Sequence, residues 1–164
     1  MILMVVNVQE ENIIPQLWRY DLFFTNIRKL IEVARERKVE VIYVGKEKNE
    51  RSDIHKELIL DNKKNIFELY DDNAFMNVDL VDYLSTINES KIMIVGLYTD
   101  TYIDATIKGG FEIHMEMIVP EFCNSTHGNK YMSGEKTYYY YNKKMWKNRY
   151  AKCISLNEAI ECLK

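Results

Sequence analysis

The chain has 164 residues, 47% of them hydrophobic, with a formal net charge of −3 and a pI near 5.7. This length and composition predict a single domain, residues 1–164, whose core needs neither disulfides nor metal. The acidic balance argues against a nucleic-acid-binding protein, and no apolar run approaches the roughly 20 residues that cross a bilayer. The first residues lack the basic region of a signal peptide, and the three cysteines show no metal-site spacing. We therefore expect reduced thiols and a cytoplasmic protein.

In the first half of the chain, apolar strands alternate with amphipathic helices. Ile2 to Val8 is a continuous apolar run, typical of a strand that is covered on both faces. Asn12 is expected to cap the next helix, with Pro15 in its first turn. The apolar positions of that helix recur at helical spacing: Leu17, Phe24, Ile27, Leu30, Ile31 and Ala34. Further along, the pattern predicts a strand at Val39 to Val44, a charged loop at Lys46 to Lys64 with one helical turn around Ile54 to Leu60, a short strand at Asn65 to Leu69 and a helix at Asp79 to Ile87.

The second half continues the alternation. Gly109 and Gly110 fall inside a predicted helix, where they either allow close packing or end the helix early. The four tyrosines at 138–141 are β-prone, yet they lie in a segment with helical character. The predicted elements are a strand at Ile92 to Val95, a helix at Thr101 to Glu112, a strand at Met115 to Val119, a loop at Glu121 to Gly134, a helix at Glu135 to Tyr150, a strand at Ala151 to Ser155 and a helix at Asn157 to Leu163 capped by Asn157.

This order of elements predicts the class of fold. Strands that alternate with helices form a parallel sheet with helices on both faces, and right-handed crossovers leave few topologies. We expect an α/β fold with three layers of the Rossmann-like kind, built on a doubly wound, mostly parallel, six-stranded sheet.

The most informative segment is KIMIVGLYTDTYIDAT, residues 91–106. A buried strand ends at Gly96, and after Leu97 and Tyr98 a helix begins. In an open α/β sheet, ligands bind at the carboxyl ends of the strands, so this turn marks a candidate binding edge.

Four segments, in order and at sensible spacing, resemble the isochorismatase-like cysteine hydrolase family. Its members open with an apolar strand that ends in Asp-Met-Gln or Asp-Val-Gln, and they place a nucleophilic cysteine after Gly, Thr and Asp in a turn like that at Gly96. The matching segments here are Met4 to Gln9, Ala34 to Val44, Asn65 to Phe75 and Ile92 to Tyr102. The resemblance covers nearly the whole chain and implies the fold expected above.

The resemblance also implies an Asp-Lys-Cys triad, and this chain departs from it at each position. The aspartate position falls on Asn7, the lysine position on Leu69 to within about one residue, and the cysteine position on Tyr102. An amide is not a useful base, and a phenol with a pKa near 10 is a poor nucleophile at neutral pH. Family members without the cysteine, the true isochorismatases, keep the aspartate and lysine. The resemblance further implies a cis peptide at Leu97-Tyr98.

Other residues are pocket candidates by their place near this edge: Gln9, Phe75, Leu97, Tyr98, Thr99, Cys123 and His127. Cys123 as a relocated nucleophile would need a base and a positive neighbour, and the sequence identifies neither. Asp53-Ile54-His55 resembles a nicotinamidase metal element, but a solvated loop is the simpler interpretation because a third ligand is missing. We expect no metal and no cofactor. Asp100 is interpreted as an acid at a helix N-terminus.

Three functions stay open. The first is a catalytically inactive family member that binds a small molecule or a protein partner, in a pocket suited to neutral or aromatic ligands. The second is a hydrolase of small amides, ureides or vinyl ethers, with Tyr102 as acid and Glu68 or Asp72 as base. The third is a structural subunit. Aromatic residues at 138–141, Trp146 and Tyr150 favour a subunit interface, and family members often form dimers or larger assemblies, so we expect a homo-oligomer.

Overall fold

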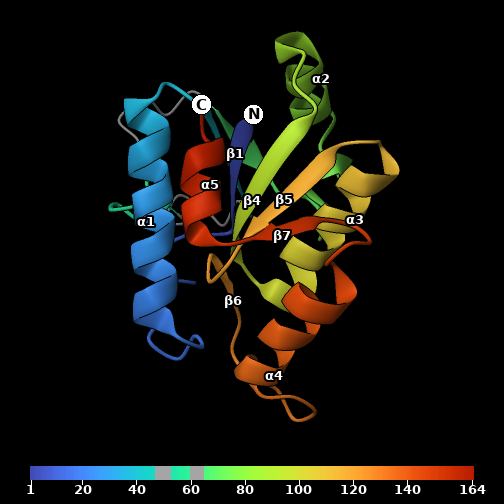
Figure 1. Cartoon of the computed structure of the whole chain (residues 1–164). Helices are drawn as coiled ribbons and strands as arrows, with labels where there is room; N and C mark the ends of the chain where they lie inside the picture. The colour runs from blue at the N-terminus through green and yellow to red at the C-terminus, as the bar shows by residue number, and fades with distance from the viewer. Residues whose placement is uncertain (47–52, 60–64) are drawn as a thin grey trace.

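The computed structural model describes residues 1–46, 53–59 and 65–164 (Figure 1). The strands are β1 Ile2–Val6, β2 Glu40–Gly45, β3 Ile66–Glu68, β4 Lys91–Leu97, β5 Glu116–Pro120, β6 Asn124–Ser125 and β7 Lys152–Ile154. The helices are α1 Tyr20–Glu36, the 3₁₀ turn η1 Ala74–Met76, α2 Val78–Ile87, the π-helical η2 Thr99–Ile103, α3 Asp104–Glu112, α4 Gly134–Tyr139, the π-helical η3 Tyr140–Met145 and α5 Leu156–Cys162.

The strands form one sheet in the order β3-β2-β1-β4-β5-β7, with β6 beside β4. The paired strands run parallel throughout this sheet. The doubly wound α/β prediction is confirmed, but the count of six strands is wrong. The segment Glu121 to Gly134, predicted as a loop, contains the two-residue β6, which pairs with the end of β4 at Gly96 and Leu97.

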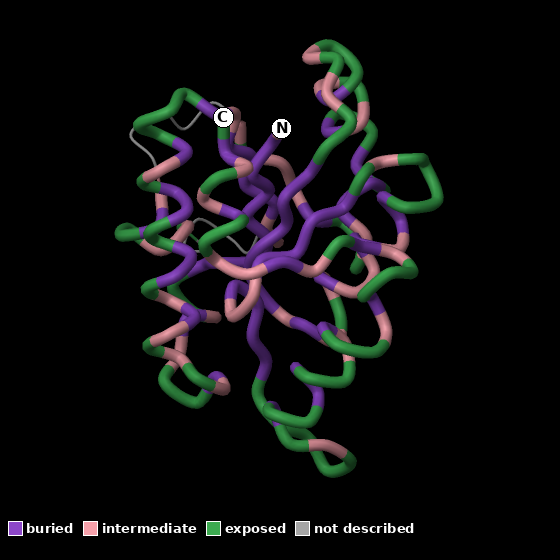
Figure 2. Tube along the Cα trace, in the orientation of Figure 1, coloured by how far each residue is buried: buried purple, intermediate pink, exposed green. Residues whose placement is uncertain are grey.

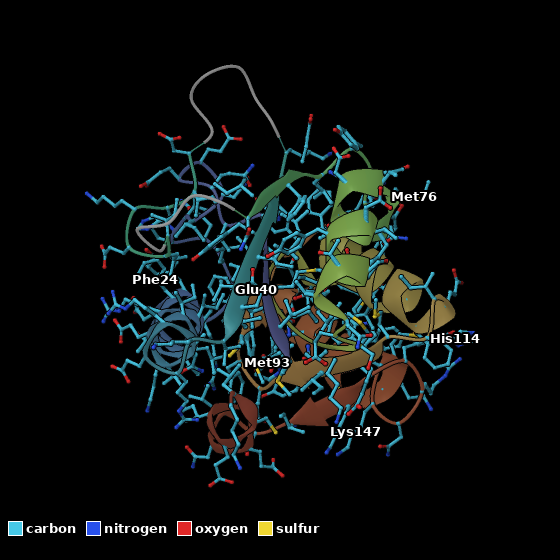
Figure 3. The ribbon with its side chains drawn as sticks, turned by 90° about the horizontal axis from the view of Figure 1, so that it is seen from above. Phe24, Glu40, Met76, Met93, His114 and Lys147 are labelled. Atoms are coloured by element: carbon cyan, nitrogen blue, oxygen red, sulfur yellow. The ribbon has the colours of Figure 1, made fainter. Side chains whose placement is uncertain are left out.

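Helices cover both faces of the sheet, as the three layers of Figure 1 show. Successive side chains of a strand point to opposite faces, so Leu3 and Val5 of β1 join the core under α1 and α5. Met4 and Val6 join the second core, under α2, α3 and η3. Figure 2 shows the central strands buried almost throughout. In Figure 3, the labelled Phe24 of α1 and Met76 before α2 mark the two sides of the sheet. Among the described residues, no helix combines the length and apolar character that a membrane span requires.

The first helix begins later than predicted. Asn12 does not cap it: α1 starts at Tyr20, after Arg19 adopts a left-handed conformation with φ 50°. The side chain of Asn12 is instead hydrogen-bonded to Asn7 and Gln9. The inward face of α1 carries Phe23 in place of the expected Phe24, which is only half-buried.

The loop predicted for Lys46 to Lys64 lies largely outside the described residues. In its described part, the amide of Leu58 donates to the carbonyl of His55 at 2.7 Å and closes a turn. The helix predicted from Thr101 begins instead with η2 at Thr99, and its two glycines allow close packing. A Cβ on Gly110 would lie 2.4 Å from Sδ of Met117.

The aromatic segment does not form the continuous helix predicted for Glu135 to Tyr150. It divides into α4 and η3, which ends at Met145 because Trp146 turns into the core. The indole Nε1 of Trp146 donates to Oδ1 of Asp104 at 2.9 Å. Tyr138 is also buried, with its ring 4.7 Å from that of Trp18. The expected aromatic surface is thus reduced to Tyr139 and Tyr140, which are 37% and 44% exposed.

The last helix is capped by Ser155, not by Asn157. Ser155 Oγ accepts from the amide of Glu158 at 3.3 Å, and the amide of Ser155 donates to the Glu158 carboxylate at 2.8 Å. These two bonds form a capping box, which satisfies amides that the helix itself leaves unpaired. The amide of Ser155 and its hydroxyl, which donates to Oε2 of Glu158 at 2.7 Å, lower the pKa of the exposed Glu158 carboxyl.

We predict that Ser155→Ala lowers the free energy of unfolding by about 1 kcal/mol, because the cap acceptor is lost. For a chain of this size the melting temperature should fall by about 2–4 °C. Asn157→Ala is the matched control two residues away and should leave the melting temperature unchanged. Thermal unfolding followed by circular dichroism checks both variants, and an equal loss in both would contradict the assignment of the cap.

Candidate functional site

The candidate site lies where the strand order reverses. From β1 the sheet extends through β2 and β3 on one side and through β4, β5 and β7 on the other. Val6 at the end of β1 pairs with Val44 of β2 and with Gly96 of β4. The carboxyl ends of these strands therefore meet at one edge, the lower one in Figure 1, where ligands bind in open α/β sheets.

Gly96 allows β1 and β4 to approach closely at this edge. Its φ is +126°, and a Cβ there would lie 2.0 Å from the carbonyl oxygen of Val6. A side chain therefore fits neither the conformation nor the space. The next peptide, Leu97-Tyr98, is cis, as the resemblance implied.

A chain of neutral amides occupies the end of β1. Asn7 is 3% exposed and adopts the left-handed conformation, which asparagine tolerates better than most residues. Nδ2 of Asn12 donates to Oδ1 of Asn7 at 3.1 Å and to Oε1 of Gln9 at 3.3 Å. Gln9 in turn donates through Nε2 to the carbonyl of Lys46. The hydroxyl of Tyr98 donates to Oδ1 of Asn12 at 3.3 Å, so the amides join β1, β2 and β4.

Lys46 brings a positive charge to this edge, which the sequence analysis did not foresee. Its Nζ lies 4.9 Å from the centroid of the Tyr102 ring. A hydrogen bond with Tyr102 is the main cause that raises the pKa of Lys46, and the charges of Asp72 and Asp71 raise it further. The signal was present in the sequence: Lys46 lies two residues after the second predicted strand, Val39 to Val44, and the carboxyl ends of parallel strands meet at one edge.

Aromatic rings form the outer part of the site. The ring centroid of Tyr98 lies 5.1 Å from that of His127 and 6.3 Å from that of Tyr102. Burial raises the pKa of Tyr98, and Tyr102 and Glu11 add to the effect. Three of the residues named from the sequence, Tyr98, Tyr102 and His127, are therefore brought together.

Thr99 and Asp100 hold the turn in place. Thr99 is buried, and its hydroxyl donates to Oδ1 of Asn124 at 2.8 Å. Asn124 and the buried Asn142 exchange two side-chain hydrogen bonds, of 2.9 and 3.1 Å. Oδ1 of Asp100 accepts a bond of 2.8 Å from the hydroxyl of Thr126. These polar contacts fix η2 against the segment that carries His127.

Four other residues named from the sequence lie in the cores. Leu69, to which the resemblance assigns the lysine position, is buried, and its amide donates to the carbonyl of Gly45 at 2.8 Å. Phe75 packs near Gly110 of α3, and Leu97 has no exposed surface. Cys123 is also fully buried, which raises the pKa of its thiol well above the ordinary value. A buried, protonated thiol is not a nucleophile.

The segment Asp53-Ile54-His55 lies beside the site without forming a metal centre. Ile54 makes an antiparallel bridge with Gln9. Nε2 of His55 lies 3.5 Å from Oε2 of Glu10, and the His55 ring packs edge-on against Phe24. Within residues 1–46, 53–59 and 65–164, no three histidine, cysteine, aspartate or glutamate side chains are grouped as metal ligands. A hollow of about 310 Å³ separates this segment from β2 and β3, with Gln9, Lys46 and Glu68 on its wall.

The sheet order defines a doubly wound α/β protein with a polar edge at the ends of β1 and β4. The family model that matches is the isochorismatase domain, over residues 1–157. The chain therefore belongs to the isochorismatase family. None of the curated proteins compared with it matches.

Solved structures agree with this fold. A cysteine hydrolase from Pseudomonas syringae pv. phaseolicola 1448A is similar with a TM-score of 0.89 and 16% identity, over 98% of this chain and 91% of that chain. An isochorismatase from Pseudomonas putida KT2440 is similar with a TM-score of 0.86 and 16% sequence identity. The match covers 95% of this chain and 88% of that chain. Another isochorismatase family protein is similar with a TM-score of 0.85 and 19% sequence identity. The match covers 94% of this chain and 97% of that chain. At these identities the likeness shows the fold alone.

We predict that Cys123 resists alkylation in the folded protein. It is fully buried, and burial also raises the pKa of the partly buried Cys153, to about 11. Iodoacetamide at neutral pH should therefore modify Cys162 first and leave Cys123 intact, as peptide mass spectrometry will show. The unfolded protein, in which all three thiols should react, is the control. Rapid native modification of Cys123 would contradict its assignment as an inert core residue.

Proposed function

We propose that this protein is a family member without hydrolytic activity on the family's substrates, and that it binds a small molecule at the edge formed by β1, β2 and β4. The observation that supports this proposal most directly is the hydrogen bonding of the buried Asn7 side chain. The resemblance assigns the aspartate position to this residue, and its side-chain oxygen accepts a hydrogen bond from Asn12. A buried, hydrogen-bonded amide at this position cannot take a proton from a nucleophile or from water.

The other assigned positions support the same conclusion. Leu69 lies in the core and supplies no charge, and Glu68 and Tyr70 beside it supply no lysine. Tyr102, whose ring centroid lies 4.9 Å from Nζ of Lys46, supplies a phenol where the resemblance implies a thiolate. No residue in this set combines a reactive nucleophile with a base, which covalent hydrolysis requires.

We propose a cytoplasmic protein, because the sequence has cysteines without a disulfide framework, and the described cysteines are free. We also propose a homo-oligomer, supported by the exposed rings of Tyr139 and Tyr140 beside the basic Lys143 and Lys144. A protein partner at the same surface is the alternative occupant.

One observation favours the second candidate, a working hydrolase with reassigned groups. Nζ of Lys46 lies 4.9 Å from the centroid of the Tyr102 ring, so a positive charge stands beside the phenol that would donate the proton. In a vinyl ether, Tyr102 would protonate the alkene carbon, and Glu68 or Asp72 would take a proton from the attacking water. The hemiketal so formed would then break into a ketone and an alcohol. Small amides and ureides are the other substrate classes.

We predict that the purified protein forms no product from a panel of small amides, ureides and isochorismate, measured by mass spectrometry against blanks without protein. The reason is the absence of a base at Asn7 and of a thiolate at Tyr102. The panel should include a family hydrolase with an intact triad, to show that each substrate can be turned over under the same conditions.

The variants Tyr102→Phe and Tyr140→Phe separate the two candidates. Tyr140 is an exposed tyrosine outside the site, so its variant is the matched control. Product that vanishes with Tyr102→Phe and persists with Tyr140→Phe would replace the inactive assignment with the hydrolase. Product that survives both changes would exclude Tyr102 as the acid and also end the proposal of inactivity.

A further inference from the structure

The side of the sheet that α2, α3 and η3 cover carries two segments of opposite charge. Residues 68–82, from the end of β3 into α2, contain five acidic residues and no lysine, arginine or histidine. Residues 136–152, from α4 through η3 to β7, contain six lysines and arginines and no acidic residue. The exposed side chains of these segments form the acidic surface and the basic surface. The net charge of the whole chain is only −3, so positive and negative charges are sorted into separate places.

The acidic surface also exposes large apolar side chains. Tyr70, Met76 and Val78 are 63%, 60% and 68% exposed, which places them among the four most exposed large hydrophobic residues that the structure describes. Asp79 and Asp82 are exposed and lie three positions apart on α2, so they share one side of the helix. Within the described residues, neither aspartate forms a salt bridge. Exposed apolar side chains that are rimmed by charges mark a site of protein interaction.

The basic surface has the complementary character. Lys144 and Lys147 are exposed, and no salt bridge occupies either of them in the part of the chain that the structure describes. Beside them lie the partly exposed rings of Tyr139 and Tyr140. One molecule therefore carries both a charged apolar surface and the surface of opposite charge that fits it.

The two surfaces lie far apart on the same side of the molecule. The acidic surface adjoins β3 at one edge of the sheet, and the basic surface leads into β7 at the other edge. Figure 3 shows Met76 and Lys147 on the same side of the sheet, with His114, just after α3, between them. Next to His114, Phe111 and Ile113 are 47% and 45% exposed. A half-turn about an axis through α3 would thus place each acidic surface on a basic surface, with apolar side chains between the two contacts.

We infer that the acidic surface binds the basic surface of a second copy of this chain, in a two-fold symmetric dimer that contains this contact twice. The inference rests on the proposed homo-oligomer and goes beyond it, because it names both surfaces and the attraction that selects them. Complementary charges direct the association and disfavour partners of like charge. Salt screens exposed charges, so the dimer should weaken as the salt concentration rises.

The test uses two double variants of the full chain. Asp79→Lys with Asp82→Lys reverses the acidic surface, and Lys144→Glu with Lys147→Glu reverses the basic surface. In either variant alone, both contacts would bring like charges together, so the dissociation constant of the dimer should rise at least about tenfold in sedimentation velocity at low salt. An equimolar mixture of the two variants should form the dimer again, because both contacts then join opposite charges. A variant that fails to fold could not be rescued in this way.

Asp21→Lys with Glu36→Lys is the matched control. Both residues are exposed on α1, on the other side of the sheet, and Asp21 lies in the first turn of its helix as Asp79 does in α2. The control changes the net charge by the same amount as the reversal of the acidic surface. It should leave the dissociation constant within about twofold of that of the wild type. Melting temperatures within about 3 °C of that of the control would show that the variants are folded.

Three results would overturn the inference. A wild type that stays monomeric at low salt and at the highest concentration measured would remove it together with the proposed homo-oligomer, and would leave the acidic surface to a basic partner of different sequence. Assembly that both reversals leave unchanged would remove only this pairing of surfaces. A mixture that fails to recover the dimer lost in each variant would do the same. The substrate screen decides catalytic inactivity independently of all three.

Discussion

The contact between β1 and β4 at Gly96 is the constraint on which the rest of the site depends. The backbone of β4 approaches Val6 so closely that no side chain fits between them. This approach places the residue after β1, Asn7, beside the turn at Leu97 and Tyr98. It also sets β2 at the right distance for Lys46 to reach Tyr102. A side chain at Gly96 would separate the two strands and move every group of the site at once.

The sequence contained enough information for the fold. Apolar runs of strand length alternate with amphipathic helices. The hydrophobic periodicity that distinguishes the two depends only on residues close together in the sequence. The beginnings and ends of helices were harder to predict. Asn12 has the side chain of a good cap, but a tertiary contact with Asn7 uses its amide. Ser155, with Glu158 three residues later, has the sequence pattern of a capping box, so this cap was within reach of the sequence. The burial of Trp146 depends on Asp104, 42 residues earlier, which no local pattern reveals.

The candidate site was predictable in position and less so in composition. Its place at the end of β1 and β4 follows from the order of strands, and the polar residues there could be named. The orientation of the Lys46 side chain could not be predicted. It depends on how β2 lies beside β1 and on the contact of the ammonium group with the Tyr102 ring. The resemblance assigns the lysine position to the strand that ends near Leu69, whereas Lys46 lies at the end of β2, the neighbouring strand in the sheet. Proximity across a parallel sheet is set by strand order, not by distance along the chain.

The amide network at the end of β1 has a consequence for how this site responds to its surroundings. Asn7, Gln9 and Asn12 do not ionise at any physiological pH. Their neighbours Lys46 and Tyr98 have raised pKa values, so one keeps its proton as an ammonium and the other as a phenol far into the alkaline range. The hydrogen-bonded core of the site thus has a constant electrical state, whereas an aspartate and a thiol would change theirs with acidity or oxidation. The amide network therefore keeps the same charge when the acidity of the solution changes.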